Sequence, residues 1–192
     1  MTRTLALLIA LGFIFGYASL GHGQGMSAKA AAPQAAAVVK DPVAAGLRTL
    51  LPRRRDDTLG AISAMPADKF GYKPTPEQNS FGHLVAHIIG FNNSFCAKAA
   101  DVAAPKVEEV KETDSKEKLL AAATASFDFC KEALDKMDDS KLGDTIDLFG
   151  GHQGSRAVAA LILSGGWSDH YAEAAMYLRL NGILPPSAQP KK

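Results

Sequence analysis

Three of the five histidines, His83, His87 and His170, fall on segments whose apolar residues recur at helical spacing. His83 and His87 are four residues apart, so a helix places both rings on one face. Neutral imidazole nitrogens bind zinc, nickel and similar divalent ions, and catalytic sites leave one coordination position open to water. The pattern therefore indicates a metal site, but HxxxH alone is of low specificity. A histidine on an apolar helical face is more often a core residue than a ligand.

The elements that must bring these rings together are four long amphipathic helices. Pro52 is expected to interrupt or kink the first helix, and only residues 145–149 have the alternation of a short strand. Gly182 suits the position after the end of the last helix. The sequence thus predicts an all-α four-helix bundle. Its helices are expected at Asp41–Met65, Ser80–Ala100, Asp114–Met137 and Ser155–Asn181.

The first 25 residues have the three parts of a secretory signal peptide. Arg3 supplies the positive start, residues 5–15 (LALLIALGFIF) are apolar, and residues 18–25 offer small side chains for cleavage. The apolar run is short for a membrane span, so no stable membrane insertion is expected after cleavage. We therefore predict a periplasmic or secreted protein, with a flexible Ala-rich leader at 26–40, a domain at 41–187 and a disordered tail at 188–192.

The charge of the chain is nearly balanced, with 21 Lys and Arg residues against 20 Asp and Glu residues. A dedicated nucleic-acid binder normally has a basic excess, so no nucleic-acid partner is expected. The partners left open by the sequence are an unidentified small molecule and a second copy of the chain, because helical bundles often associate through helix faces.

Cys96 and Cys130 are the only cysteines. An even count in an exported protein favours a disulfide, here between the second and third helices. A simple helical hairpin would misalign the two residues, because Cys96 lies near the end of its helix and Cys130 midway along the next. The long loop between the helices could correct this stagger; otherwise the two residues are buried free thiols.

Two stretches resemble the DinB/YfiT-like superfamily of metalloenzymes. They are residues 65–100, which include Phe81-Gly82 and His87, and residues 155–187 (SRAVAALILSGGWSDHYAEAAMYLRLNGILPPS). The resemblance covers about residues 41–187. It implies a four-helix bundle with a crossover connection. It also implies, in members that bind metal, one histidine on the second helix and two on the last helix, spaced four residues apart.

This chain departs from that ligand pattern. His87 and His170 match two of the ligands, but the position four residues before His170 is Gly166, which has no side chain. His83 could be the third donor instead. Glu173, one turn after His170, could serve as a ligand or as the hydrogen-bond acceptor that orients the ring. Asp169 points about 100° away from His170 on the helix, which disfavours it.

Two functions follow from the sequence. The first is a metal-dependent hydrolase or thiol transferase of unknown substrate, as relatives suggest, using a partly degraded divalent-metal site. The alternative is a non-catalytic binding or stress-related bundle without metal, with a small apolar ligand in a groove between the second and fourth helices.

Overall fold

The computed structural model describes residues 38–190. The expected signal peptide, and the expected leader up to residue 37, lie outside the described residues. The four predicted helices are present, together with a small two-stranded sheet, of which the sequence indicated only the strand at residues 145–149. The elements are α1 (Pro42–Ala64), η1 (Ala67–Lys69), α2 (Phe81–Ala100), α3 (Lys116–Lys136), β1 (Thr145–Phe149), β2 (His152–Ser155), α4 (Arg156–Leu180) and η2 (Pro186–Ala188).

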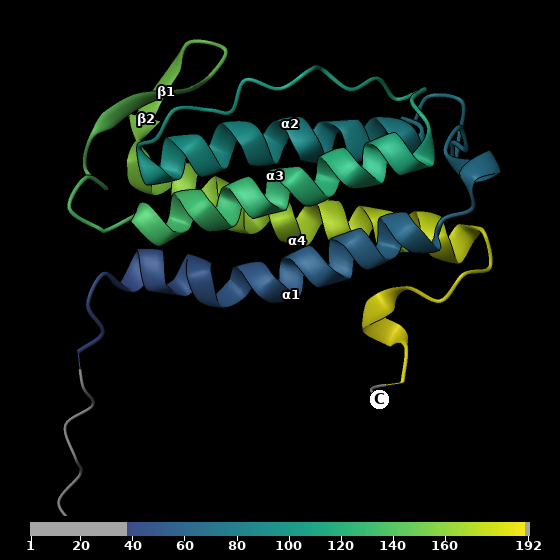
Figure 1. Ribbon diagram of the computed structural model, residues 1–192, viewed down its shortest axis with the longest axis horizontal. Helices are drawn as coiled ribbons and strands as arrows, with labels where there is room; N and C mark the ends of the chain where they lie inside the picture. Colours follow the sequence, from purple (N-terminus) through teal and green to yellow (C-terminus); the bar gives the residue numbers. More distant parts are fainter. Residues whose placement is uncertain (1–37, 191–192) are drawn as a thin grey trace, which may run out of the picture. The chain divides into compact units, whose positions relative to one another are not determined.

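The crossover connection that the resemblance implied is present. α2 and α3 run in the same direction, and residues 101–115 return along the length of α2 to join them (Figure 1). We call residues 101–115 the strap. α1 and α4 run in the opposite direction to α2 and α3, so α1 packs antiparallel against α3, and α4 packs antiparallel against α2. This arrangement places the start of α2, with His83 and His87, beside the second half of α4, with His170.

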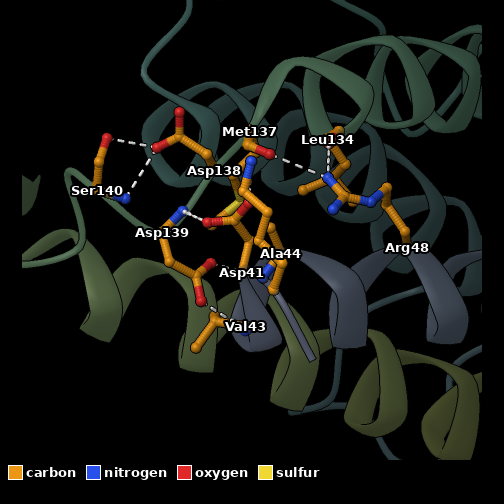
Figure 2. A network of polar contacts seen from close by, with 10 residues as sticks. Asp41, Val43, Ala44, Arg48, Leu134, Met137, Asp138, Asp139 and Ser140 are labelled. Atoms are coloured by element: carbon orange, nitrogen blue, oxygen red, sulfur yellow. Dashed lines mark hydrogen bonds and ion pairs between the residues drawn. The ribbon is translucent and has the colours of Figure 1, made fainter. Parts of the chain in front are cut away.

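The start of α1 is capped by Asp139, which follows the end of α3. Asp41 occupies the predicted cap position, but its own carboxylate accepts no hydrogen bond from the first turn of α1. Instead, the carboxylate of Asp139 accepts from the backbone N–H groups of Val43 and Ala44, at 2.8 and 2.9 Å (Figure 2). In return, Arg48 donates to the carbonyls of Leu134 and Met137 at the end of α3, at 2.8 and 3.0 Å. These bonds satisfy free backbone groups at both helix ends and fix α1 against α3.

Pro52 does not end α1, which continues through it to Ala64. The other helix starts follow the sequence: the Ser80 hydroxyl accepts from His83 N–H in α2, and the Ser115 hydroxyl accepts from Lys118 N–H in α3. The strand expected at 145–149 pairs with residues 152–155 through the two-residue turn Gly150-Gly151, where both residues have positive φ.

The C-terminal residues pack back onto the bundle. Gly182 has a φ of 72°, as expected for the residue after the last helix. The backbone N–H of Ser187 donates to the Tyr171 hydroxyl at 2.8 Å, and the Pro186 ring lies over Gly60 of α1. Ala188, which the sequence placed in a disordered tail, ends the short helix η2. Among residues 38–190, no helix is long and apolar enough to cross a membrane.

Candidate functional site

His87 and His170 face each other across the contact between α2 and α4. Their ring centroids are 4.9 Å apart and the ring planes are nearly perpendicular, at 89°. His87 is exposed, whereas His170 is half-buried. The two residues that match the superfamily's ligand pattern are therefore brought together, as expected from the sequence.

The surroundings of His170 keep its ring neutral. Burial, followed by the nearby His87, lowers the pKa of His170 from 6.5 to about 4, and the charge of Asp169 opposes this shift. The Nδ1 atom of His170 is buried and has no hydrogen-bond partner. A buried polar atom without a partner costs free energy, so a residue with such an atom calls for an explanation beyond packing.

The third position of the expected ligand set is occupied by an aromatic ring. A Cβ atom added at Gly166 would lie 2.3 Å from Cζ of Phe91 and 2.8 Å from its Cε1. The same ring stands edge-on to His170, with centroids 4.7 Å apart at 90°. The space in which a third imidazole would begin is thus filled by Phe91.

The other predicted ligands do not complete the set. His83 is exposed and lies on the strap side of α2, with its Nδ1 3.5 Å from Oε2 of Glu112. Asp169 is exposed on α4. Glu173 is half-buried, and its charge adds to burial in raising the pKa of Tyr177. Among the described residues, no three His, Cys, Asp or Glu side chains are placed to hold a metal ion. The side chains present therefore do not fit a three-donor metal centre.

A cleft lies beside His87, between α2 and the strap. Its volume is about 590 Å³, and its wall on the α2 side includes both His83 and His87. The second wall of this cleft is formed by the strap, so the cleft differs from the groove between α2 and α4 that was predicted from the sequence. The cleft is lined by His83, Ala86, His87, Ile89, Gly90, Asn93, Val107, Glu108, Glu109, Val110 and Glu112.

The strap is fixed to α2 at the end nearer His83. A Cβ atom at Gly82 would lie 2.2 Å from the backbone oxygen of Glu112, so only glycine lets the strap approach this closely. The Ser80 hydroxyl donates to the Glu112 carboxylate at 2.8 Å. Glu112 was not singled out from the sequence. The Phe81-Gly82 pair was singled out, and it marks the point where the strap meets α2.

The strap is fixed at its other end as well. Asp101 forms ion pairs with Arg156 at 2.8 Å and with Lys141 at 2.5 Å. The backbone N–H of Val102 donates to the carbonyl of Ala97. Within the described residues, no hydrogen bond involves the backbone of residues 103–110. This part of the strap stands away from α2, and the space between them is the cleft.

The predicted disulfide between Cys96 and Cys130 is present, with the Cα atoms 5.1 Å apart. The parallel course of α2 and α3 explains why it forms. Cys96 lies four residues before the end of α2 and Cys130 six before the end of α3, so the two are at nearly the same level. Closing a loop of this length stabilises a fold by roughly 3–4 kcal/mol in the chain-entropy model.

Next to the disulfide, a buried polar network joins three helices. Asn92 of α2 accepts from the Trp167 indole N–H at 3.0 Å and donates to the Ser126 hydroxyl at 3.1 Å. Ser126 in turn donates to the Ala123 carbonyl at 2.8 Å. Asn92 was not singled out from the sequence, because its hydrogen-bond partners come from other helices.

Comparison with known proteins identifies the fold. A model of the DinB superfamily matches residues 50–168. The chain belongs to the DinB superfamily. Members of this superfamily commonly bind divalent metal ions. No curated protein matches this chain.

Two solved structures of DinB-like proteins share the fold. One, from Bacillus subtilis, has 20% identity and a TM-score of 0.60, and the match covers 76% of this chain and 99% of that one. The other, from Bacillus cereus, has 15% identity and a TM-score of 0.61, with 74% and 95% covered. At these identities the likeness concerns the DinB fold alone.

Proposed function

We propose that this DinB chain is an exported, non-catalytic binding protein that holds a small organic cation in the cleft between α2 and the strap. The observation that carries the proposal is the lining of that cleft. Three carboxylates, from Glu108, Glu109 and Glu112, face it, and none of its lining residues is a lysine or arginine. Such a cleft favours a positively charged molecule.

The apolar residues of the cleft define the rest of the ligand. Ile89 of α2 lies on one wall, and Val107 and Val110 of the strap lie on the other. Val107 is 60% exposed, so a bound apolar group would remove its side chain from water. Of the three carboxylates, Glu108 is near Lys118, at 3.6 Å, and Glu112 is near His83, which leaves Glu109 as the best placed to meet a cation. An amine carrying an aromatic or branched apolar group fits this chemistry.

Calorimetric titration with phenethylammonium tests the proposal, with benzoate as an anion of similar size. The wild-type protein is expected to bind the cation and not the anion. The variant Glu109→Gln/Glu112→Gln should bind it about tenfold more weakly, which corresponds to about 1.4 kcal/mol. Glu132→Gln, at an exposed position of α3, is the matched control and should bind as the wild type does. Equal binding by wild type and double variant, or none by either, would refute the proposed ligand class.

The second candidate function is a metal-dependent hydrolase or thiol transferase. It is favoured by the two facing imidazoles of His87 and His170 and by the unpartnered Nδ1 of His170. His83 or Glu173 would have to move to supply a further donor, because neither now stands with that pair. Two imidazoles alone hold a divalent ion weakly, so this candidate requires metal affinity that depends on His87.

We also propose that the protein acts in the periplasm or outside the cell. The signal-like residues 1–25 and the disulfide support this location, since disulfides persist in oxidising compartments. Cell fractionation should find the full chain outside the cytoplasm and a chain lacking residues 2–25 inside it. Full-length protein that stays cytoplasmic would contradict the proposal.

A further inference from the structure

We infer that Phe91 and Gly166 form a matched pair in which an aromatic ring replaces the third ligand and takes over its role of joining α2 to α4. His87 and His170 then remain as two of the three ligands of a metal site that the Phe91 ring keeps closed. This inference rests on the α2–α4 contact and does not depend on what the cleft beside the strap binds.

The first step in the argument is that Gly166 is required by space and not by backbone conformation. It lies inside α4, where a glycine is unfavourable compared with alanine, and its φ is not positive. An added Cβ atom would meet three atoms of the Phe91 ring at 2.3, 2.8 and 3.0 Å. Its neighbour Gly165 would meet nothing within 4 Å, although it belongs to the same turn of the same helix.

The second step is that the Phe91 ring is held on several sides. It is edge-on to His170, with centroids 4.7 Å apart, and it lies against Phe95, also at 4.7 Å, with the two planes 31° apart. His87 is one turn earlier on α2, with its ring centroid 6.3 Å from that of Phe91. Contact with these three rings opposes a rotation of the Phe91 ring that would make room for a side chain at position 166.

The third step concerns what this packing achieves. A metal ion bound by residues of α2 and α4 would link the two helices, and here the Phe91 ring makes that link by contact with Gly166 and His170. The exchange accounts for the unpartnered Nδ1 of His170, whose ring keeps its place in the contact through the Phe91 ring.

A double-mutant cycle on thermal stability tests the pairing. Gly166→Ala should lower the Tm of the wild-type protein by several degrees, because the methyl group meets Phe91. In the background of Phe91→Ala the same change should leave the Tm unchanged or raise it, since helix propensity then dominates. Gly165→Ala, the matched control, should be neutral or raise the Tm in both backgrounds. Additive effects of Phe91→Ala and Gly166→Ala would overturn the pairing.

Rebuilding the ligand set tests whether His87 and His170 are placed as two ligands of one metal site. The variant Phe91→Ala/Gly166→His should bind Zn²⁺ at least about 100-fold more tightly than the wild type does in competition with a chelator, and Zn²⁺ should raise its Tm. Adding His87→Ala to that variant should abolish the gain. A folded double variant whose Zn²⁺ affinity equals that of the wild type would show that His87 and His170 are not placed to bind one ion together with a third histidine. If the double variant does not fold, the double-mutant cycle decides the inference alone.

Discussion

Phe91 and Asn92 are neighbours on α2, yet they face two polar regions of opposite character. On the Asn92 side, a fully buried amide has partners for both its oxygen and its nitrogen, from α4 and α3. On the Phe91 side, the imidazole of His170 has a buried nitrogen without any partner. Both regions join α2 to α4, but only one of them satisfies its polar atoms.

The difference distinguishes buried polar groups that hold the fold together from a buried polar group that the fold leaves without a partner. Buried polar groups that hold a fold together are almost always hydrogen-bonded, as the Asn92 network is. In the described residues, only two buried side-chain nitrogen or oxygen atoms lack partners, Nε of Arg156 and Nδ1 of His170. Arg156 still pairs through its other nitrogens with Asp101 and with the carbonyl of Lys98, whereas His170 has no other hydrogen bond among these residues. His170 is therefore the one side chain of the α2–α4 contact that has a buried polar atom and no hydrogen-bond partner at all among the described residues.

The largest effect that would sharpen this comparison is expected at Asn92. Asn92→Ala leaves the Trp167 indole N–H without an acceptor in the core, and it also opens a small cavity. Chemical denaturation should show a loss of about 2–3 kcal/mol in the free energy of unfolding. Asn93→Ala, on the half-buried neighbour that lines the cleft, is the control and should cost less than about 1 kcal/mol. Equal losses for the two variants would break the distinction.

A smaller, pH-dependent effect is expected at His170. The pKa of His170 is about 4 in the fold and near 6.5 in the unfolded chain, so the unfolded chain binds more protons between these values. Acidification from about pH 6.5 to 4 should therefore lower the free energy of unfolding, by on the order of 1–2 kcal/mol, since partial exposure of the ring moderates the effect of burial.

His170→Leu should remove that part of the pH dependence, measured by denaturation at several pH values, and His152→Gln, at an exposed position of the hairpin, should not. Three aspartates act in a lower range, because hydrogen bonds hold their pKa values below the usual 3.8. These are Asp101, bonded to Lys141, Asp114, bonded to Lys111, and Asp138, bonded to Ser140. A slope between pH 6.5 and 4 that survives in His170→Leu would show that His170 is not the buried neutral group described here.

The sequence predicted the helices well because their signals are local. Ser80 caps α2 as its position before an apolar run indicates, and Gly182 follows the last helix with the positive φ that glycine allows. The disulfide was predicted from cysteine count and compartment. Its geometry was left open, because a simple hairpin would misalign the two cysteines; the strap makes α2 and α3 parallel and so brings the cysteines to nearly the same level.

The site was predicted only in part, because its decisive contacts join residues far apart in the chain. The pairing of His87 with His170 followed from the ligand pattern, and Gly166 marked the missing position. That Phe91 fills this position depends on how α2 and α4 pack, which spacing alone does not fix. Two features of the sequence hinted at this contact. Gly166 lies in the interior of a helix, where no turn requires a glycine, and Phe91 lies four residues after His87. Likewise, the cleft depends on the path of the strap, and the sequence predicted only that this segment is a charged loop.

The most direct test of the central claim, that the Phe91 ring has replaced a tight metal centre, is the metal content of the untagged wild-type protein after incubation with Zn²⁺ or Ni²⁺ and desalting. We expect less than about 0.2 equivalents, unchanged by His87→Ala, because two imidazoles without a third donor hold an ion weakly. Close to one equivalent of metal, lost on His87→Ala, would contradict the account and favour the metal-dependent enzyme.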